Sequence, residues 1–225
     1  MKTTLKNING EFVRSESNFR NWVTKDGSAG PTGEDGFAAE PGRYHLYVSY
    51  ACPWAHRTLI FRTLKGLEDV ISVSVVHPLM PAESWVFGEY PGATEDHINN
   101  AHYLYENYLK ADPQFNGLVT VPMLWDKKRN TVVNNESSEI IRMLNSAFNE
   151  FGNTDVDYYP ENLREEIDAI NKPIYDNINN GVYRAGFAKT QEAYNKALDR
   201  KSTRLNSSHV ALSRMPSSAW KKKKK

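Results

Sequence analysis

The chain has little of several features that define other protein classes. Only one of its 225 residues is a cysteine, Cys52, which excludes an intramolecular disulfide and a cysteine-rich zinc site. No run of about 18 apolar residues occurs, so we expect no membrane span. The first residues, Met1 to Lys6, lack the apolar stretch of a secretory signal. A reducing compartment, most simply the cytoplasm, fits these features best.

An excess of charge of one sign is also lacking, but the charges are unevenly distributed. The formal net charge is +1, from 28 basic and 27 acidic residues. Residues 201–225 hold eight of the basic residues and no acidic one, leaving 20 basic against 27 acidic residues elsewhere. A body this acidic is not typical of a nucleic-acid-binding protein. The segment 201–225 resembles translated sequencing-adapter sequence followed by a translated poly(A) run, and we expect it to be an artefactual tail outside the fold.

Turn-forming residues dominate the first 43 residues, which we interpret as an N-terminal extension. Its Gly-rich stretch, residues 26–36, is flanked by Phe19, Trp22 and Phe37. Aromatic residues beside such a stretch suggest that the extension packs against another part of the chain.

Residues 44–155 alternate between strand and helix patterns and predict an α/β domain. The predicted elements are a strand over 44–48, a helix over 53–65, a strand over 71–76, a helix over 99–110, strands over 119–125 and 131–133, and a helix over 137–148. The first three make a βαβ unit, so their strands should be parallel. A long irregular insertion, residues 77–98, interrupts the pattern, and long ordered loops are often functional.

From residue 156 to residue 200 the pattern becomes helical. Apolar residues recur at steps of three and four, which predicts an amphipathic helix: Leu163, Ile167, Ile170, Ile174 and Ile178. Another helix begins over 191–198. Between them, residues 179–187 read as a non-helical break that carries Tyr183.

Cys52 carries the clearest chemical signal. It follows a predicted strand and precedes Pro53, so it should lie at the N-cap of a helix, where backbone N–H groups and the helix dipole favour a thiolate. The alternative is an inert buried cysteine. The second thiol of a Cys-x-x-Cys pair is absent because Ala55 occupies its place, so an external thiol must resolve a mixed disulfide of Cys52. In a cytosol the abundant external thiol is glutathione.

Three other positions are weaker candidates. Val121-Pro122, at the start of a predicted strand, could be a cis or an ordinary trans edge proline. Glu136-Ser137 opens a helix and suits the charged γ-glutamyl end of glutathione, although a first-turn Glu and Ser are also ordinary capping residues. Tyr183 could donate a proton or simply be packed.

Five stretches together resemble the Xi-class glutathione transferases, the glutathionyl-hydroquinone reductases. They are residues 48–58, residues 71–80, Val119-Thr120-Val121-Pro122, Asn135-Glu136-Ser137 and residues 179–187. The resemblance covers roughly residues 8 to 200. It implies an α/β thioredoxin-like domain followed by an all-helical glutathione-transferase domain, incomplete here because the family's helical domain continues well beyond residue 200. It also implies glutathione as co-substrate, no metal, and usually a homodimer.

The resemblance also implies a role for each matching residue. Cys52 is the nucleophile, and Tyr183 donates a proton to the quinol. The residues implied to bind glutathione are Trp85, which lies over it, Leu118, Val119, Thr120 and Val121, which pair with its backbone, and Glu136 and Ser137, which hold its γ-glutamyl group. Val121 precedes the family's cis-proline.

The activity implied is removal of glutathione from S-glutathionyl-hydroquinones through a cysteinyl-glutathione mixed disulfide. An Omega-like thioltransferase or dehydroascorbate reductase would use the same lone cysteine. A non-catalytic glutathione-binding remnant is a third interpretation. The long insertion with Trp85 favours the first, because an aromatic lid suits a flat aromatic substrate.

Overall fold

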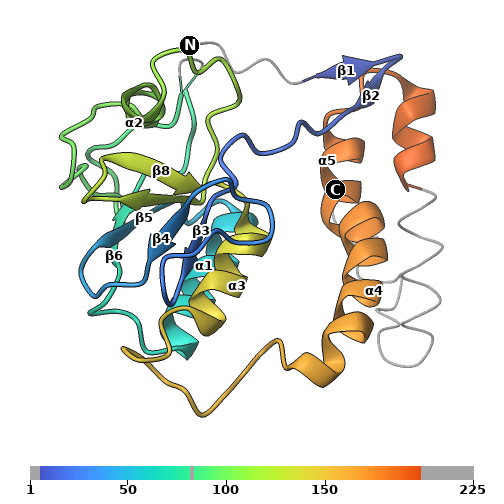
Figure 1. The fold of residues 1–225 in the computed structure, drawn as a ribbon. Helices are drawn as coiled ribbons and strands as arrows, with labels where there is room; N and C mark the ends of the chain where they lie inside the picture. Colours follow the sequence, from blue (N-terminus) through green and yellow to red (C-terminus); the bar gives the residue numbers. More distant parts are fainter. Residues whose placement is uncertain (1–5, 82–83, 199–225) are drawn as a thin grey trace, which may run out of the picture. The chain divides into compact units, whose positions relative to one another are not determined.

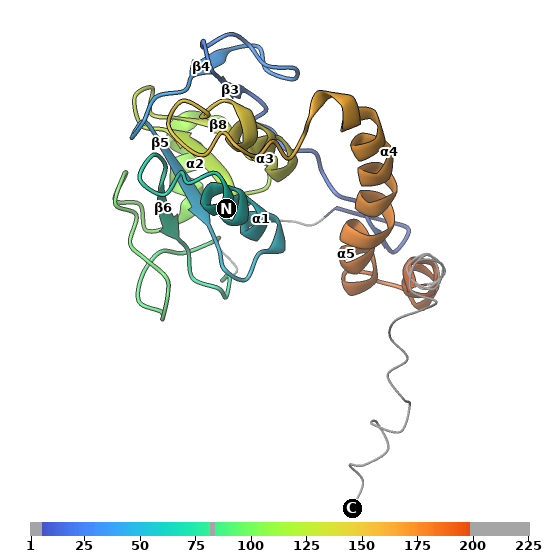
Figure 2. The same ribbon diagram turned by 90° about the horizontal axis from the view of Figure 1, so that it is seen from below.

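The computed structural model describes residues 6–81 and 84–198, which form two compact units (Figures 1 and 2). The first unit comprises residues 15–161. The described residues of the second are 6–14 and 162–198. The predicted tail, residues 201–225, lies outside the described residues.

A four-stranded mixed sheet forms the centre of the first unit, in the order β6-β5-β7-β8. Its strands are β5 (Tyr44–Val48), β6 (Ser72–Val75), β7 (Met123–Asp126) and β8 (Thr131–Asn134). β5 and β6 are parallel, which confirms the predicted βαβ unit, and β7 runs antiparallel to both of its neighbours. Every residue of the central strand β5 is buried, which explains its aromatic and β-branched composition.

Three helices accompany this sheet: α1 (Pro53–Leu64), α2 (Leu104–Ala111) and α3 (Ser137–Ser146). α1 and α3 lie side by side, and α2 packs near β8, away from that pair (Figure 1). The N-terminal ends of α1 and α3 both lie next to the chain that enters β7, since Cys52 before α1 contacts Val121 and Asn135 before α3 contacts Thr120.

Two predicted element starts in this unit are wrong. The helix expected over 99–110 begins only at Leu104, because the Asp96 carboxylate accepts the N–H groups of Ile98, Asn99 and Ala101 and holds them in turns. The strand expected over 119–125 begins only at Met123, because residues 118–122 form no ladder with a neighbouring strand. The Val121-Pro122 bond is cis.

The N-terminal extension packs as its aromatic residues suggest. Its strands β3 (Trp22–Thr24) and β4 (Gly36–Ala38) are parallel to each other, and the segment before β3 lies along the edge strand β8. Phe37 is buried in the core shared with the sheet. A Cβ atom at Gly36 would overlap the carbonyl oxygen of Ser28, so the Gly-rich stretch closes tightly over this strand pair.

The second unit is helical apart from the hairpin of β1 (Asn7–Ile8) and β2 (Glu11–Phe12). After a short 3₁₀ turn, η1 (Glu161–Leu163), its helices are α4 (Arg164–Ile174), the π-helical turn η2 (Tyr175–Asn179), α5 (Asn180–Gly186) and a helical stretch over 191–198. No helix among the described residues is long and apolar enough to cross a membrane.

The non-helical break predicted around Tyr183 is wrong. Pro173 has no N–H to donate, and the chain continues through a π turn in which the Asn180 N–H donates to the Tyr175 carbonyl. Gly181 has no positive φ, so it continues the helix instead of ending it. Tyr183 therefore lies within α5.

Candidate active site

Cys52 is the N-cap residue of α1, as predicted. Its backbone is extended (φ −98°, ψ 113°) and Pro53 occupies the first helical position. Its side chain is half-buried, and the thiol donates to the carbonyl oxygen of Val121 across 3.5 Å. The thiol thus lies between the positive end of a helix dipole and the segment that leads into β7.

Residues 118–121, the segment that contacts the thiol, are fixed by hydrogen bonds from side chains elsewhere in the unit. The Thr120 carbonyl accepts the hydroxyl of Tyr108 across 2.8 Å, and the Thr120 hydroxyl accepts Nδ2 of Asn135 across 3.2 Å. The Val121 N–H has no hydrogen-bond partner among the described residues. A backbone with an unused donor beside the thiol can pair with the backbone of a peptide-like ligand.

The N-terminus of α3 supplies the polar side chains of the site. Glu136 is its N-cap and accepts the Ser138 N–H across 3.2 Å. The Ser137 hydroxyl accepts Nε and Nη2 of Arg57, across 3.0 and 2.7 Å. Arg57 belongs to α1, five positions after Cys52, and its Nη2 also lies 3.7 Å from Oε1 of Glu136. Arg57 therefore joins the helix of the thiol to the helix of the acidic group, a link that the sequence analysis missed.

The comparisons with known proteins agree with this geometry. Residues 51–147 match the family model described as glutathione S-transferase, N-terminal domain. A glutathionyl-hydroquinone reductase of Escherichia coli is 60% identical over 194 residues, which are 86% of this chain and 59% of that protein. One from Sphingobium chlorophenolicum is 53% identical over 192 residues, 85% of this chain and 58% of that protein. The chain thus spans somewhat under three fifths of these relatives.

The similar solved structures are also glutathione transferases. A glutathione-bound glutathione transferase homologue from Escherichia coli matches with a TM-score of 0.82 at 58% identity, covering 84% of this chain and 62% of that one. Glutathione transferase Xi from Phanerochaete chrysosporium matches with a TM-score of 0.80 at 50% identity, covering 87% and 65%. The chain is therefore a close homologue of glutathionyl-hydroquinone reductases and of Xi-class glutathione transferases. The predicted order of a thioredoxin-like domain and a helical region is confirmed.

Trp85, predicted to lie over glutathione, is half-buried against the core of the same unit as Cys52. Its carbonyl accepts the N–H of Leu104, and the next residue, Val86, forms a bridge with Tyr103. These contacts attach the long insertion to the start of α2. The role of Trp85 over glutathione stays a prediction.

Tyr183, predicted to donate a proton, belongs to the second unit. Its ring stacks on Phe12, with centroids 6.4 Å apart, and the Arg14 guanidinium lies 4.3 Å from the centre of the Tyr183 ring. The tyrosine is therefore fixed by side chains from the N-terminal segment of its own unit. Its part in the reaction stays a prediction.

The described part of the chain shows no group of three or more His, Cys, Asp or Glu side chains that could hold a metal ion. The side chains gathered around Cys52 come from helix N-termini and an extended backbone, which suits an organic ligand with peptide-like and charged ends.

Proposed function

We propose that the protein removes glutathione from S-glutathionyl-hydroquinones, with Cys52 as the nucleophile. The observation that carries the proposal is the lone thiol at the N-cap of α1, with its sulfur 3.5 Å from the Val121 carbonyl. The relatives named glutathionyl-hydroquinone reductases support it, since they share more than half of their residues with this chain over the matched region.

Glutathione fits the charges and hydrogen-bonding groups around the thiol. Its γ-glutamyl ammonium complements the Glu136 carboxylate, and its α-carboxylate complements Ser137 at the helix N-terminus. Its peptide backbone pairs with Leu118, Val119, Thr120 and Val121, and Trp85 covers it. This placement brings the glutathione sulfur to Cys52.

The chemistry then has two steps. The Cys52 thiolate attacks the glutathione sulfur of the substrate, the carbon–sulfur bond breaks, and its electron pair goes to the aromatic carbon, which takes a proton from Tyr183. Cys52 is left in a mixed disulfide with glutathione. A second glutathione thiolate attacks the glutathione sulfur of that disulfide, which releases oxidised glutathione and restores the Cys52 thiolate.

Three further parts of the proposal concern the whole protein. A cytoplasmic location supplies the reduced glutathione that the second step consumes. A homodimer is implied by the family resemblance. The substrates are glutathione and glutathionyl-quinols, and nucleic acid is not among the partners.

The first test replaces the nucleophile. Cys52→Ser should lower reduction of a glutathionyl-hydroquinone by orders of magnitude, because a hydroxyl is far less acidic than a thiol and forms no disulfide. Mass spectrometry of the wild type, mixed with substrate before the second glutathione is added, should show Cys52 carrying one glutathione. A variant rate above about a tenth of the wild-type rate would contradict covalent catalysis.

The same assay separates the proposed reaction from general thioltransferase activity. Tyr183→Phe should slow reduction of the glutathionyl-hydroquinone, which needs a proton at carbon, and spare reduction of a model mixed disulfide, whose leaving group is a thiolate. Faster turnover of the mixed disulfide than of the quinol conjugate by the wild type would favour the Omega-like alternative.

A further inference from the structure

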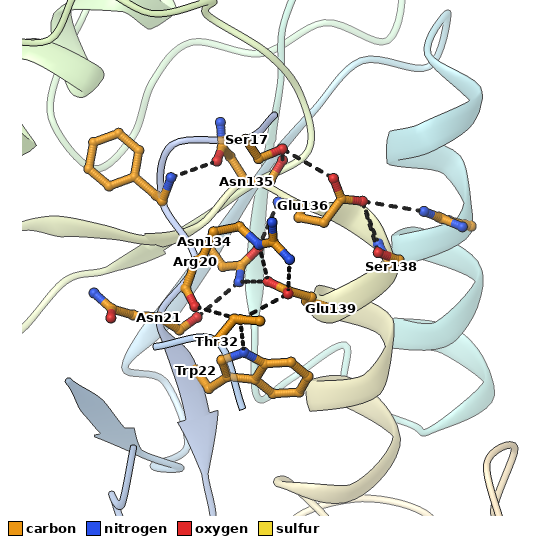
Figure 3. A network of polar contacts seen from close by, with 12 residues as sticks. Ser17, Arg20, Asn21, Trp22, Thr32, Asn134, Asn135, Glu136, Ser138 and Glu139 are labelled. Atoms are coloured by element: carbon orange, nitrogen blue, oxygen red, sulfur yellow. Dashed lines mark hydrogen bonds and ion pairs between the residues drawn. The ribbon is translucent and has the colours of Figure 1, made fainter. Parts of the chain in front are cut away.

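The two oxygens of the Glu136 carboxylate differ in how many donors surround them (Figure 3). Its Oε1 atom accepts the N–H of Ser138 across 3.2 Å and the Ser138 hydroxyl across 2.9 Å, and it faces Arg57. Its Oε2 atom accepts a single described donor, the hydroxyl of Ser17, across 3.1 Å. A carboxylate offers about four acceptor positions, so the unused capacity lies at Oε2, next to Ser17.

The Ser17 hydroxyl has unused capacity at the same place. It has one proton and two acceptors within reach, Oε2 of Glu136 at 3.1 Å and the Asn135 carbonyl at 3.3 Å. It donates to one of them at a time, and both of its lone pairs stay available to accept a hydrogen bond. The residue is half-buried, so a ligand can reach it.

The segment that carries Ser17 is fixed to the first turn of α3. Arg20 forms a two-pronged ion pair with Glu139, whose carboxylate also accepts the amide of Asn134 and the hydroxyl of Thr32 (Figure 3). The Phe19 N–H donates to Oδ1 of Asn135 across 3.1 Å. These bonds hold the extension two and three residues after Ser17, and the Ser17 hydroxyl itself lies within hydrogen-bond distance of Glu136 and Asn135, so it is placed before a ligand arrives.

We propose that Ser17 of the N-terminal extension is a ligand of the glutathione α-ammonium, together with Glu136. An ammonium has three N–H donors, of which one reaches Oε2 of Glu136 and a second the Ser17 oxygen, while the Ser17 proton turns to the Asn135 carbonyl. The inference rests on the proposed function and assigns the extension a direct part in glutathione recognition.

The test measures glutathione binding by calorimetric titration. Ser17→Ala should raise the dissociation constant of glutathione about five- to twentyfold, and Ser17→Thr, which keeps the hydroxyl, should retain most of the affinity. Ser15→Ala, a change at an exposed serine of the same segment, is the matched control and should have no effect. Thermal melting of each variant checks that the fold is retained.

Two further titrations test whether Ser17 contacts the α-ammonium of glutathione directly. Glutaryl-cysteinyl-glycine, which is glutathione without its α-amino group, should bind Ser17→Ala and the wild type equally. In a Glu136→Gln background, Ser17→Ala should still weaken glutathione binding, because the hydroxyl contacts the ammonium itself. An equal loss for both ligands, no loss for glutathione, or no further loss in the Glu136→Gln background would each overturn the assignment.

These outcomes also separate this inference from the function on which it rests. A wild type that binds glutathione, weakened by Glu136→Gln and unaffected by Ser17→Ala, would refute only the role of Ser17. A wild type with no measurable affinity for glutathione would refute the proposed function as well.

Discussion

His45 is a titratable side chain enclosed by the central sheet. It lies on β5 with 1% of its surface exposed, and its Nδ1 is 2.7 Å from the Ser72 hydroxyl on β6. Its Nε2 has no hydrogen-bond partner among the described residues. Burial lowers the pKa of His45 to about 3, against an ordinary value of 6.5, because the charged ring would lose its hydration. The folded protein therefore holds a neutral imidazole.

The neutral His45 makes stability depend on pH. Below about pH 6.5 the unfolded chain binds a proton at this ring and the folded chain does not, so stability should fall as the pH drops from 7 towards 4, by at most roughly 1.4 kcal/mol per pH unit from this group. Urea unfolding of the wild type and His45→Asn at pH 7, 6 and 5 measures the effect. The free energy of unfolding should depend less steeply on pH in His45→Asn than in the wild type. His97→Asn, a change at an exposed histidine, is the control and should keep the wild-type dependence. Equal slopes in the wild type and His45→Asn would contradict a neutral buried ring.

The residues of the site differ in how far the sequence could predict them. Cys52 and Glu136 were predictable because each stands just before a helix whose start is visible locally. Arg57 and Ser17 were not, because the side chains that they contact lie 80 and 119 positions away in the chain. Only the packing of α1 and of the extension against α3 makes these residues neighbours.

At the scale of elements, one carboxylate organises the insertion that carries Trp85. The buried side chain of Asp96 accepts five hydrogen bonds. The donors are the Tyr47 hydroxyl, the N–H groups of Ile98, Asn99 and Ala101, and the amide of Asn107. Burial alone would raise the pKa of Asp96, but these donors outweigh it and hold the pKa below its usual value. The turn that they form leads into residues 102–104, which pair with the backbone of residues 85–87.

We therefore expect Asp96→Asn to loosen the insertion. The asparagine amide has one acceptor oxygen where the aspartate has two, and its NH₂ group faces the remaining donors. The substitution should therefore lower the free energy of unfolding by roughly 2–3 kcal/mol. Hydrogen exchange should speed up in the amides of residues 84–104 more than in β5. Asp69→Asn, at an exposed aspartate, is the control. Unchanged exchange over residues 84–104 in Asp96→Asn would show that other contacts hold the insertion. Because the pKa of Asp96 is lowered, its contribution in the wild type should be present near neutral pH and lost as the pH falls through the acidic range.

The same interactions explain which elements the sequence could predict. The strands β5 to β8 and the helices α1 to α3 follow from local apolar periodicity, and their order was predicted, whereas β3 and β4 of the extension were not. The start of α2 was not, because it depends on how Asp96 uses its oxygens. The helical path through residues 179–187 was not predicted either, since a π turn after Pro173 leaves no signature in the apolar pattern.

At the scale of the whole molecule, the two units differ in how well they bury apolar side chains. The continuous core belongs to the first unit, where residues such as Leu46 and Leu124 are fully buried. In the second unit, no residue of α4 is buried: Ile170 is 59% exposed, and Leu163, which precedes the helix, is 41% exposed. Apolar burial contributes about 25 cal/mol per Å². Each Å² left in water reduces the stability of the second unit by that amount.

We expect the two units to unfold separately, the second at the lower temperature or denaturant concentration. Backbone amides of α4 and α5 should exchange with deuterium before those of β5 and β7. The tryptophans among the described residues all lie in the first unit, so their fluorescence reports its unfolding. A thermal melt followed by circular dichroism, which reports helix content, should therefore begin at a lower temperature than a melt followed by tryptophan fluorescence. Leu46→Ala, in the core, should lower the later transition by about 2–5 kcal/mol, and Ile170→Ala, at an exposed position of α4, should change that transition little. Coincident transitions by both probes, with uniform amide exchange, would mean that the units unfold as one cooperative body, and that the exposure of α4 does not set the order in which they unfold.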